Sequence, residues 1–455
     1  MNIVILGAGE VGSYLATTLS EEEHNVVIVD KNPQALEKVS QKADIAVKHG
    51  SGTDWKLLEE LLDHNPHIFI ALSSDDETNL VACSIAKNLG YPTTVARIRQ
   101  NTFLDRFRLD FARLFFVDHF IGTELIVAHD LLKSISHPGN LAVESFAHGS
   151  VQMRTILVPS HWPYFKKNLS ELPLPKNLLV GLIRRKSFQE SQIRPKEKII
   201  FPKGQDYILP GDEVTIIGEV DEMMQLYHFF GIPYKKVSSV TIAGGSSIAL
   251  HLCRLLIESH IHVTIIEKEE KTCKMIAEQF PEAIVLHQDA SDIHFLIEEQ
   301  MFRSDFFLCC TRSNETNILI AALAKQAGCK EVLTLISDES YSTLLRRLGI
   351  LFSLSEKVSI AHRIHAILHQ GSISSISSLY HNQAKIIEMK VSSDSEVVGI
   401  PIRNLKNHLP LHFLIALIEN RGRITVAKGD HILTPGDTII VICSPEHIQE
   451  LEKIF

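Results

Sequence analysis

The sequence MNIVILGAGEVG at residues 1–12 indicates how the first module folds. An apolar, β-branched run, Asn2–Leu6, leads into three glycines with the spacing Gly-x-Gly-x-x-Gly. Gly7 permits a tight turn, Gly9 lets a phosphate approach the backbone, and Gly12 lets a helix pack closely on the strand. The stretch therefore predicts a strand–turn–helix unit whose helix N-terminus can bind a pyrophosphate.

The residue after the second expected strand narrows the ligand class. Val26–Val29 is again apolar and β-branched, and Asp30 follows it directly. A carboxylate at this position accepts hydrogen bonds from both ribose hydroxyls and opposes a 2′-phosphate. We therefore expect NAD, NADH or another adenosine nucleotide without a 2′-phosphate, such as ATP or ADP, rather than NADP. The alternative is a structural turn that binds no ligand.

Strand and helix patterns alternate through the rest of this module. Further strands are expected at Ile45–Lys48, Ile68–Leu72 and Thr94–Ile98, and helices at Val11–Ser20, Trp55–Leu62 and Glu77–Asn88. Strands separated by single helices predict an α/β fold with a parallel, doubly wound, Rossmann-like sheet. In such a sheet, ligands bind beyond the carboxyl ends of the strands.

Five residues are expected at that edge. Gly52 and Thr53 follow the third strand, Ser73 and Ser74 follow the fourth, and Arg97 lies at the end of the fifth. The Arg97 guanidinium can pair with a phosphate, and a surface arginine is the alternative. Ser74 also begins a Ser-x-x-Glu capping box, so the serine hydroxyls serve the ligand, the helix or both.

The chain is a tandem of two kinds of module. The phrase SSDDETN at Ser73–Asn79 returns as TRSNETN at Thr311–Asn317, each time before an apolar helical run. Turn segments at 202–204 and 210–212, PKG and PGD, return as AKG and PGD at 427–429 and 435–437. The order is therefore A–B–A′–B′, and a repeat of this length predicts a duplicated architecture.

The loop of the second copy is degraded. Gly244 and Glu267 match the first glycine and Asp30, but Ser246 and Ala249 replace the other two glycines. The Cβ of Ser246 crowds the pyrophosphate approach, whereas Glu267 still offers a ribose acceptor. Arg312 stands where the first copy has a serine. Nucleotide binding and a purely structural repeat are both open for this copy.

Each Rossmann-like module is followed by a helical stretch and then a small module with short strands. Strands of the first small module are expected at Thr155–Val158, Leu178–Ile183, Ile199–Phe201 and Val214–Ile217, which indicate a mixed α/β module. The Rossmann-like modules are placed at 1–121 and 237–353. Crossover helices or linkers are placed at 122–140 and 354–372, and the small modules at 141–225 and 373–455.

Composition and missing motifs exclude several function classes. The chain has 45 Lys and Arg against 54 Asp and Glu, a net charge of −9, which argues against nucleic acid as a general partner. No apolar run approaches the roughly 18–20 residues of a membrane-spanning helix. Because the P-loop, His-Glu-x-x-His and Gly-x-Ser-x-Gly motifs are absent, no catalytic residue is predicted. The seven scattered cysteines indicate a reducing compartment.

A histidine group on the second crossover helix is the candidate for a metal. His362, His365 and His369 share one helix face, but no carboxylate lies between the last two. We expect exposed or interface histidines, with a metal-binding or pH-sensing role as the alternative, and we predict no metal site.

These residues resemble the TrkA family, the cytoplasmic regulatory subunits of Trk potassium-uptake systems. The resemblance rests on GAGEVG at 7–12, Asp30, SSDDETN at 73–79 and ARIR at 96–99, and on the duplication, which is similar to alternating RCK N- and C-terminal domains. The family pattern implies cofactor contacts at the following residues: Gly7, Ala8, Gly9, Glu10, Val11, Asp30, Ser73, Ser74 and Arg97 in the first copy, and Gly244, Gly245, Ser246, Ser247, Ile248, Glu267, Thr311 and Arg312 in the second.

The resemblance also implies a function. It implies a non-enzymatic NAD(H)-binding subunit, peripheral to the inner face of the cell membrane, that forms a homo-oligomeric ring under a potassium-translocating membrane subunit. A nucleotide that prefers one arrangement of the modules would shift the population and thereby gate transport. The competing interpretations are an NAD-dependent oxidoreductase with a duplicated Rossmann core and a free nucleotide sensor.

Overall fold

The computed structural model describes residues 1–105, 108–187, 196–337, 339–350, 352–368, 373–380, 383–407, 409–410, 412–420 and 422–455 of the 455. These residues form two units. Unit 1 comprises residues 1–132 and 237–364, and unit 2 comprises residues 133–236 and 365–455. The chain therefore passes from one unit to the other three times.

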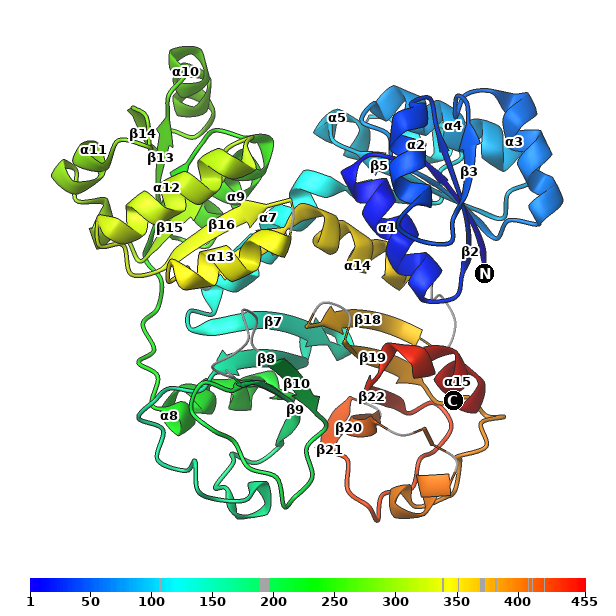
Figure 1. Ribbon diagram of the computed structural model, residues 1–455, viewed down its shortest axis with the longest axis vertical. Helices are drawn as coiled ribbons and strands as arrows, with labels where there is room; N and C mark the ends of the chain where they lie inside the picture. The colour runs from blue at the N-terminus through cyan, green and yellow to red at the C-terminus, as the bar shows by residue number, and fades with distance from the viewer. Residues whose placement is uncertain are drawn as a thin grey trace. The chain divides into compact units, whose positions relative to one another are not determined.

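Unit 1 contains two parallel six-stranded sheets (Figure 1). Residues 1–122 form lobe 1, in which the strand order is β3-β2-β1-β4-β5-β6. Its strands are β1 (Asn2–Leu6), β2 (Asn25–Asp30), β3 (Ala46–His49), β4 (Ile68–Ala71), β5 (Thr93–Ile98) and β6 (His119–Gly122). Its helices are α1 (Glu10–Glu21), α2 (Pro33–Ser40), α3 (Trp55–Leu61), α4 (Asp76–Leu89), α5 (Asn101–Leu104) and α6 (Phe111–Leu114).

Residues 237–355 form lobe 2, which repeats this order as β14-β13-β12-β15-β16-β17. Its strands are β12 (Ser239–Ala243), β13 (His262–Glu267), β14 (Ile284–His287), β15 (Phe306–Cys309), β16 (Val332–Ile336) and β17 (Phe352–Ser355). Its helices are α9 (Ser247–Glu258), α10 (Glu270–Gln279), α11 (Ile293–Glu298), α12 (Asn314–Gln326) and α13 (Ser342–Arg347).

The central strands form the core because helices cover both faces of each sheet. All four residues of β4 are buried, as are all four of β15. Full burial of one large aliphatic or aromatic side chain stabilises the fold by roughly 1.5–3 kcal/mol. Because these strands are buried on both faces, their sequences are continuous apolar runs rather than alternating apolar and polar residues.

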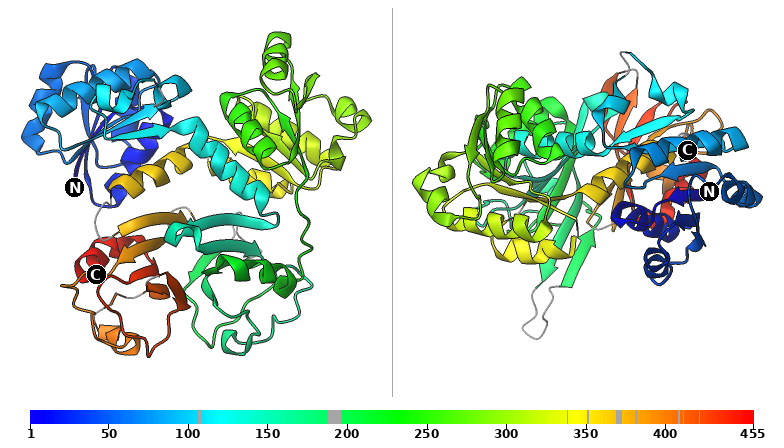
Figure 2. Two further views of the ribbon diagram at one scale, coloured as in Figure 1. Left: turned by 180° about the vertical axis from the view of Figure 1, so that it is seen from behind. Right: turned by 90° about the horizontal axis from the view of Figure 1, so that it is seen from above.

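Two long helices lie between the lobes (Figure 2). Helix α7 (Thr123–Ser136) begins directly after β6, and α14 (Glu356–Leu368) begins directly after β17. The Nζ atom of Lys357 on α14 lies 5.3 Å from the centre of the Tyr14 ring on α1. The helix that follows lobe 2 therefore packs against lobe 1.

Unit 2 contains two antiparallel five-stranded sheets, ordered β10-β9-β11-β8-β7 and β18-β19-β22-β20-β21. The strands are β7 (Asn140–Phe146), β8 (Val151–Leu157), β9 (Leu178–Ser187), β10 (Lys196–Ile200), β11 (Glu213–Glu219), β18 (Ile373–Leu379), β19 (Ala384–Lys390), β20 (Phe413–Asn420), β21 (Arg423–Val426) and β22 (Thr438–Cys443). Short helices α8 (Gln225–Phe230) and α15 (Ile448–Ile454) complete the modules. One apolar cluster, which includes Met153, Ile217, Ile386 and Ile442, joins the two sheets.

The predicted α/β class with two Rossmann-like sheets is confirmed, and each is followed by a small module. The prediction missed the sixth strand of lobe 1, β6, and helix α2. It also missed strand β7, which lies next to the predicted linker and pairs with β8. Short edge strands have only weak sequence patterns, because their formation depends mainly on pairing with the neighbouring strand. None of the helices in the described part of the chain has the length and apolar content that a membrane span requires.

Candidate functional site

The loop between β1 and α1 is built as its glycine spacing predicts. Gly7 has a φ of +106°, and its N–H donates to the Val29 carbonyl at 2.8 Å. A Cβ on Gly12 would lie 1.9 Å from the Gly7 carbonyl oxygen, so a larger residue there would push α1 away from the strand. Among the described residues, a Cβ on Gly9 would meet nothing within 4 Å, and no side chain caps α1. The first helix N-terminus is therefore open to a ligand.

Asp30 holds this loop in place. Its Oδ2 accepts a hydrogen bond from the Ala8 N–H at 2.6 Å, and its Oδ1 accepts one from the Asn32 N–H at 2.8 Å. Each carboxylate oxygen has a second lone pair, so a ribose hydroxyl can still donate to it. Asp30 therefore positions the loop, and its remaining lone pairs are available for the predicted ribose contact.

A buried asparagine joins the tips of the fourth and fifth strands. The Asn79 Oδ1 accepts from the Ser73 N–H at 3.0 Å and from the Ser73 hydroxyl at 2.7 Å. Its Nδ2 donates to the carbonyls of Ser73 at 3.1 Å and Arg97 at 3.0 Å. Asn79 has no exposed surface, and it brings Ser73 and Arg97 to the same edge of the sheet.

Sequence reasoning missed Asn79 as a site residue, although a signal was present. The repeat has Asn317 at the matching place, and Asn317 makes the same four bonds: to the Thr311 N–H at 2.8 Å, the Thr311 hydroxyl at 2.7 Å, the Thr311 carbonyl at 3.3 Å and the Leu335 carbonyl at 3.2 Å. An amide is needed here because both donors and acceptors must be satisfied in a buried place.

The other predicted residues of lobe 1 have different surroundings. Gly52 is buried, and a Cβ on it would lie 2.1 Å from the Leu6 side chain, so this glycine serves packing. The Thr53 hydroxyl lies 2.9 Å from the Ser51 hydroxyl. The predicted capping box at Ser74 is wrong: Asp75 caps α4, accepting from the Thr78 N–H at 2.9 Å. Ser74 lies exposed before the cap.

In lobe 2 the carboxylate contacts are the same. The Glu267 Oε2 accepts from the Gly245 N–H at 2.6 Å, and its Oε1 accepts from the Glu269 N–H at 2.8 Å. A cavity of about 740 Å³ lies here, lined by Gly244, Gly245, Ser246, Glu267 and Thr311 among others. We call it the lobe 2 cavity. The degraded loop therefore still leaves room for a ligand.

The helix N-terminus of lobe 2 differs from that of lobe 1. The Ser246 hydroxyl accepts from the Ala249 N–H at 3.3 Å and lies 3.2 Å from the Cys310 sulfur. Helix α9 is thus capped by its own serine, whereas no side chain in the described ranges caps α1. A phosphate that binds at the N-terminus of α9 would have to replace the hydrogen bond from the Ala249 N–H to the Ser246 hydroxyl.

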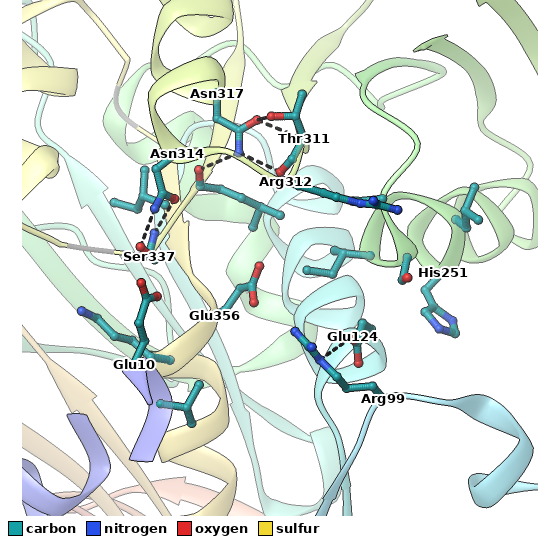
Figure 3. Close-up of a pocket in the computed structure, with 18 of the residues that line it drawn as sticks. Glu10, Arg99, Glu124, His251, Thr311, Arg312, Asn314, Asn317, Ser337 and Glu356 are labelled. Atoms are coloured by element: carbon teal, nitrogen blue, oxygen red, sulfur yellow. Dashed lines mark hydrogen bonds and ion pairs between the residues drawn. The ribbon is translucent and has the colours of Figure 1, made fainter. Parts of the chain in front are cut away.

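A second cavity lies between the lobes of unit 1, and we call it the interlobe cavity. Its volume is about 800 Å³. Figure 3 shows charged side chains from both lobes and from both crossover helices around it. Glu10, Val11, Ser247 and Ile248 line this cavity. Other members of its lining are Arg99, Glu124, His251, Arg254, Arg312, Glu356 and Lys357.

Arg97 is buried and interacts electrostatically with Glu124 and Glu356, which line this cavity, so the alternative of a surface arginine is wrong. Its side chain is 9% exposed, and its Nε has no hydrogen-bond partner among the described residues. Burial lowers the pKa of the Arg97 guanidinium, and Arg99 lowers it further, while Glu124 and Glu356 oppose this shift. Burial also raises the pKa of the Glu356 carboxyl, and Arg97 opposes that rise.

The raised pKa of Glu356 predicts how the stability of the chain changes with pH. The folded chain binds more protons than the unfolded chain between the ordinary and the raised pKa, so its free energy of unfolding falls as the pH rises through that window. We expect Glu356→Gln to raise Tm relative to wild type above the window and to change Tm little below it. Thermal denaturation at several pH values, from acidic to mildly alkaline, measures this difference.

The control for this prediction is Glu315→Gln, at the exposed first turn of α12, where a backbone hydrogen bond lowers the carboxyl pKa. A lowered pKa gives the opposite sign, so this variant should not gain stability as the pH rises. A Tm difference for Glu356→Gln that shrinks with rising pH would contradict the assignment.

The expectation that all three histidines are exposed or at an interface is contradicted, as to exposure, by one of them. His362 and His365 lie on α14. His365 is buried, with 2% of its surface exposed. His369 lies outside the described residues. Within the described ranges, no group of three or more His, Cys, Asp or Glu side chains is placed to hold a metal ion. All seven cysteines are buried.

Comparison with known proteins gives full-length matches. The TrkA-N domain model matches residues 3–117 and 240–356, and the TrkA-C domain model matches residues 153–231 and 386–455. The chain is 28% identical to Trk system potassium uptake protein TrkA homolog 1 of Methanosarcina mazei, over 100% of both chains. It is 27% identical to Trk system potassium uptake protein TrkA of Haemophilus influenzae, over 100% of this chain and 98% of that one.

A similar fold occurs among solved structures. A structure described as the GsuK channel bound to NAD aligns with a TM-score of 0.61 at 16% identity, over 100% of this chain and 78% of that chain. At 16% identity, this similarity shows that the two proteins share a fold.

Proposed function

This chain belongs to the TrkA family, with two TrkA-N and two TrkA-C domains, and on that premise we propose that NAD or NADH binds at the Asp30 site and regulates a potassium-translocating membrane subunit. The family consists of regulatory potassium-uptake proteins rather than enzymes. The proposed site comprises the loop of lobe 1, Asp30, and the strand tips that Asn79 joins.

The observation that carries this proposal is the open N-terminus of α1. Gly9 leaves space in front of the helix, and no side chain in the described part of the chain caps it. The Asp30 carboxylate, at the end of β2, is bonded to the same loop and has lone pairs to spare. A pyrophosphate and an adenine ribose need these two groups at these two places. The NAD-bound GsuK channel, which shares the fold, supports the same choice of ligand.

Regulation follows if the nucleotide prefers one arrangement of unit 1. A ligand shifts a conformational equilibrium only through its difference in affinity for the two states. A coupling of roughly 1–3 kcal/mol between nucleotide binding and the conformational equilibrium shifts that equilibrium constant about 5- to 150-fold. We further propose that the protein binds the cytoplasmic side of its membrane partner as a ring of identical chains.

The test uses the full chain and a Trk-type membrane subunit in proteoliposomes. We expect NADH to change the initial rate of potassium flux severalfold when the full chain is present, and to do nothing when it is absent. The chain should also co-purify with the membrane subunit from detergent-solubilised membranes. Flux that does not respond to NADH at saturating chain concentration would refute the proposed regulation.

A further inference from the structure

Carboxylates from the first turns of four helices interact electrostatically with one another and with two arginines of lobe 1. These carboxylates belong to Glu10 of α1, Asp76 of α4, Glu124 of α7 and Glu356 of α14. The arginines are Arg97 in β5 and Arg99, which directly follows that strand. The cluster therefore joins the carboxyl edge of the lobe 1 sheet to both crossover helices.

The arginines of this cluster come from one copy only. Asn79 bonds to the Arg97 carbonyl, whereas Asn317 of the repeat bonds to the Leu335 carbonyl, so Leu335 stands where lobe 1 has Arg97. By the same register, Ser337 stands where lobe 1 has Arg99. Lobe 1 thus supplies the positive charges for the acidic residues of both crossover helices.

Glu356 differs from the other buried acids of the cluster because no short contact fixes its charge. Asp76 accepts from the Arg99 N–H at 3.0 Å and from the Gln100 N–H at 2.8 Å. The Glu124 Oε1 lies 3.4 Å from the Arg99 Nε. The half-buried Glu356 carboxylate forms no ion pair within the described ranges. Its protonation state is therefore free to follow the charges placed near it.

The neighbours of Glu356 act on it in both directions. Arg97 and Arg99 favour its ionised form, and Glu124 and Glu10 favour its neutral form, as burial does by raising the pKa of the carboxyl. The other titratable groups around it are Lys357 on the same helix, the Cys310 thiol directly after β15, and His251, Arg254 and Arg312 in the lining of the interlobe cavity. A new negative charge on the lobe 1 side would add to the effect of Glu10.

The proposed nucleotide site of lobe 1 lies where such a charge would act. Glu10 and Val11 begin α1, and both line the interlobe cavity together with Glu356 (Figure 3). A pyrophosphate at the N-terminus of α1 would repel an ionised Glu356. It would also compete with Glu356 for the Arg97 guanidinium, whose Nε has no partner in the described part of the chain. Both effects favour the neutral carboxyl.

We propose that Glu356 takes up a proton from solvent when NAD or NADH binds to lobe 1, so that one site responds to the nucleotide and to pH together. This rests on the proposed function, because it names a second signal that acts through the same site. The ionised Glu356 holds Arg97 toward α14, and the protonated Glu356 leaves the guanidinium to the ligand. Since α14 leads from lobe 2 toward unit 2, the proton also changes how that helix is held against lobe 1.

The test is calorimetric titration of the full chain with NADH at several pH values, from mildly acidic to mildly alkaline, in two buffers of different ionisation enthalpy. We expect NADH affinity to fall about threefold or more as the pH rises through the range in which Glu356 ionises, with proton uptake on binding. In Glu356→Gln this fall and the proton uptake should both disappear. The variant should match wild type at the acidic end and bind more tightly than wild type at the alkaline end.

The matched control is Glu331→Gln in lobe 2. Burial also raises the pKa of the Glu331 carboxyl, but this residue lines neither the interlobe cavity nor the lobe 2 cavity. Its NADH affinity should follow pH as that of wild type does. Thermal denaturation shows whether each variant is folded, and Glu356→Ala, which also lacks the titrating carboxyl, replaces Glu356→Gln if that variant does not fold.

The outcomes separate the two proposals. An identical pH dependence in wild type and Glu356→Gln, or proton release on NADH binding to wild type, would overturn the role of Glu356. NADH binding that depends on Asp30 but is indifferent to Glu356 would leave the proposed function standing. The absence of NADH binding at every pH would overturn both.

Discussion

Asp30→Ala should weaken NADH binding to the full chain by about 100-fold or more. The substitution removes the acceptor of the ribose hydroxyls and the two backbone bonds, from Ala8 and Asn32, that hold the loop in its binding shape. Hydrogen bonds to a charged group contribute roughly 1.5–3 kcal/mol each, and about 1.4 kcal/mol corresponds to a tenfold change in affinity. Calorimetric titration with NADH measures the change.

The matched control is Glu267→Ala. Glu267 makes the same two backbone contacts in lobe 2 at nearly the same distances, so the two variants disturb equivalent loops. We expect NADH affinity to remain within about twofold of wild type in Glu267→Ala. If Asp30→Ala binds NADH as wild type does, the lobe 1 loop does not bind a dinucleotide.

Asn79→Ala should destabilise lobe 1 by roughly 3 kcal/mol or more, because buried polar groups left without a partner cost about 1–3 kcal/mol each. The substitution would leave the Ser73 N–H, the Ser73 carbonyl and the Arg97 carbonyl without the partner they have now. It would also separate two strand tips at the ligand edge, so NADH binding should fall together with stability. Urea denaturation of the full chain, followed by hydrogen exchange in α4 and β5, measures the loss.

The control for Asn79 is another asparagine of the same helix. Asn88 is exposed on α4, and its Nδ2 donates to the Ser84 carbonyl at 2.8 Å, within the same helix. Asn88→Ala should change stability by less than about 0.5 kcal/mol, as most surface substitutions do. A similar loss for both variants would mean that the strand-tip network does not account for the effect of Asn79, since alanine has the higher helix propensity and cannot by itself cause a loss.

The predicted strand–turn–helix structure around the loop is confirmed, because its determinants are neighbours in the sequence. The glycine spacing, the β-branched runs and the acidic residue after the second strand act within one βαβ unit, and residues 1–30 contain all of them. The N-cap of α4 was placed one residue too early, because Ser74 and Asp75 are both good caps and backbone geometry decides between them. The role of Asn79 was missed because it bonds to a strand that lies outside the local pattern.

The amino-acid order alone established the duplicated α/β architecture, the glycine-rich loop and the family resemblance, since repeats, glycine spacing and hydrophobic periods are properties of contiguous sequence. Folding decided what depends on residues far apart in the chain: the burial of Arg97 beside Glu356, the cavity between the lobes, and the presence of Arg99 and Arg312 around one space. These features arise when α7 and α14 pack between two sheets that are separated in sequence by more than a hundred residues. Neither composition nor a local motif predicts these contacts between the lobes. Electrostatic and packing energies depend on distances between residues, and those distances are set only when the chain folds.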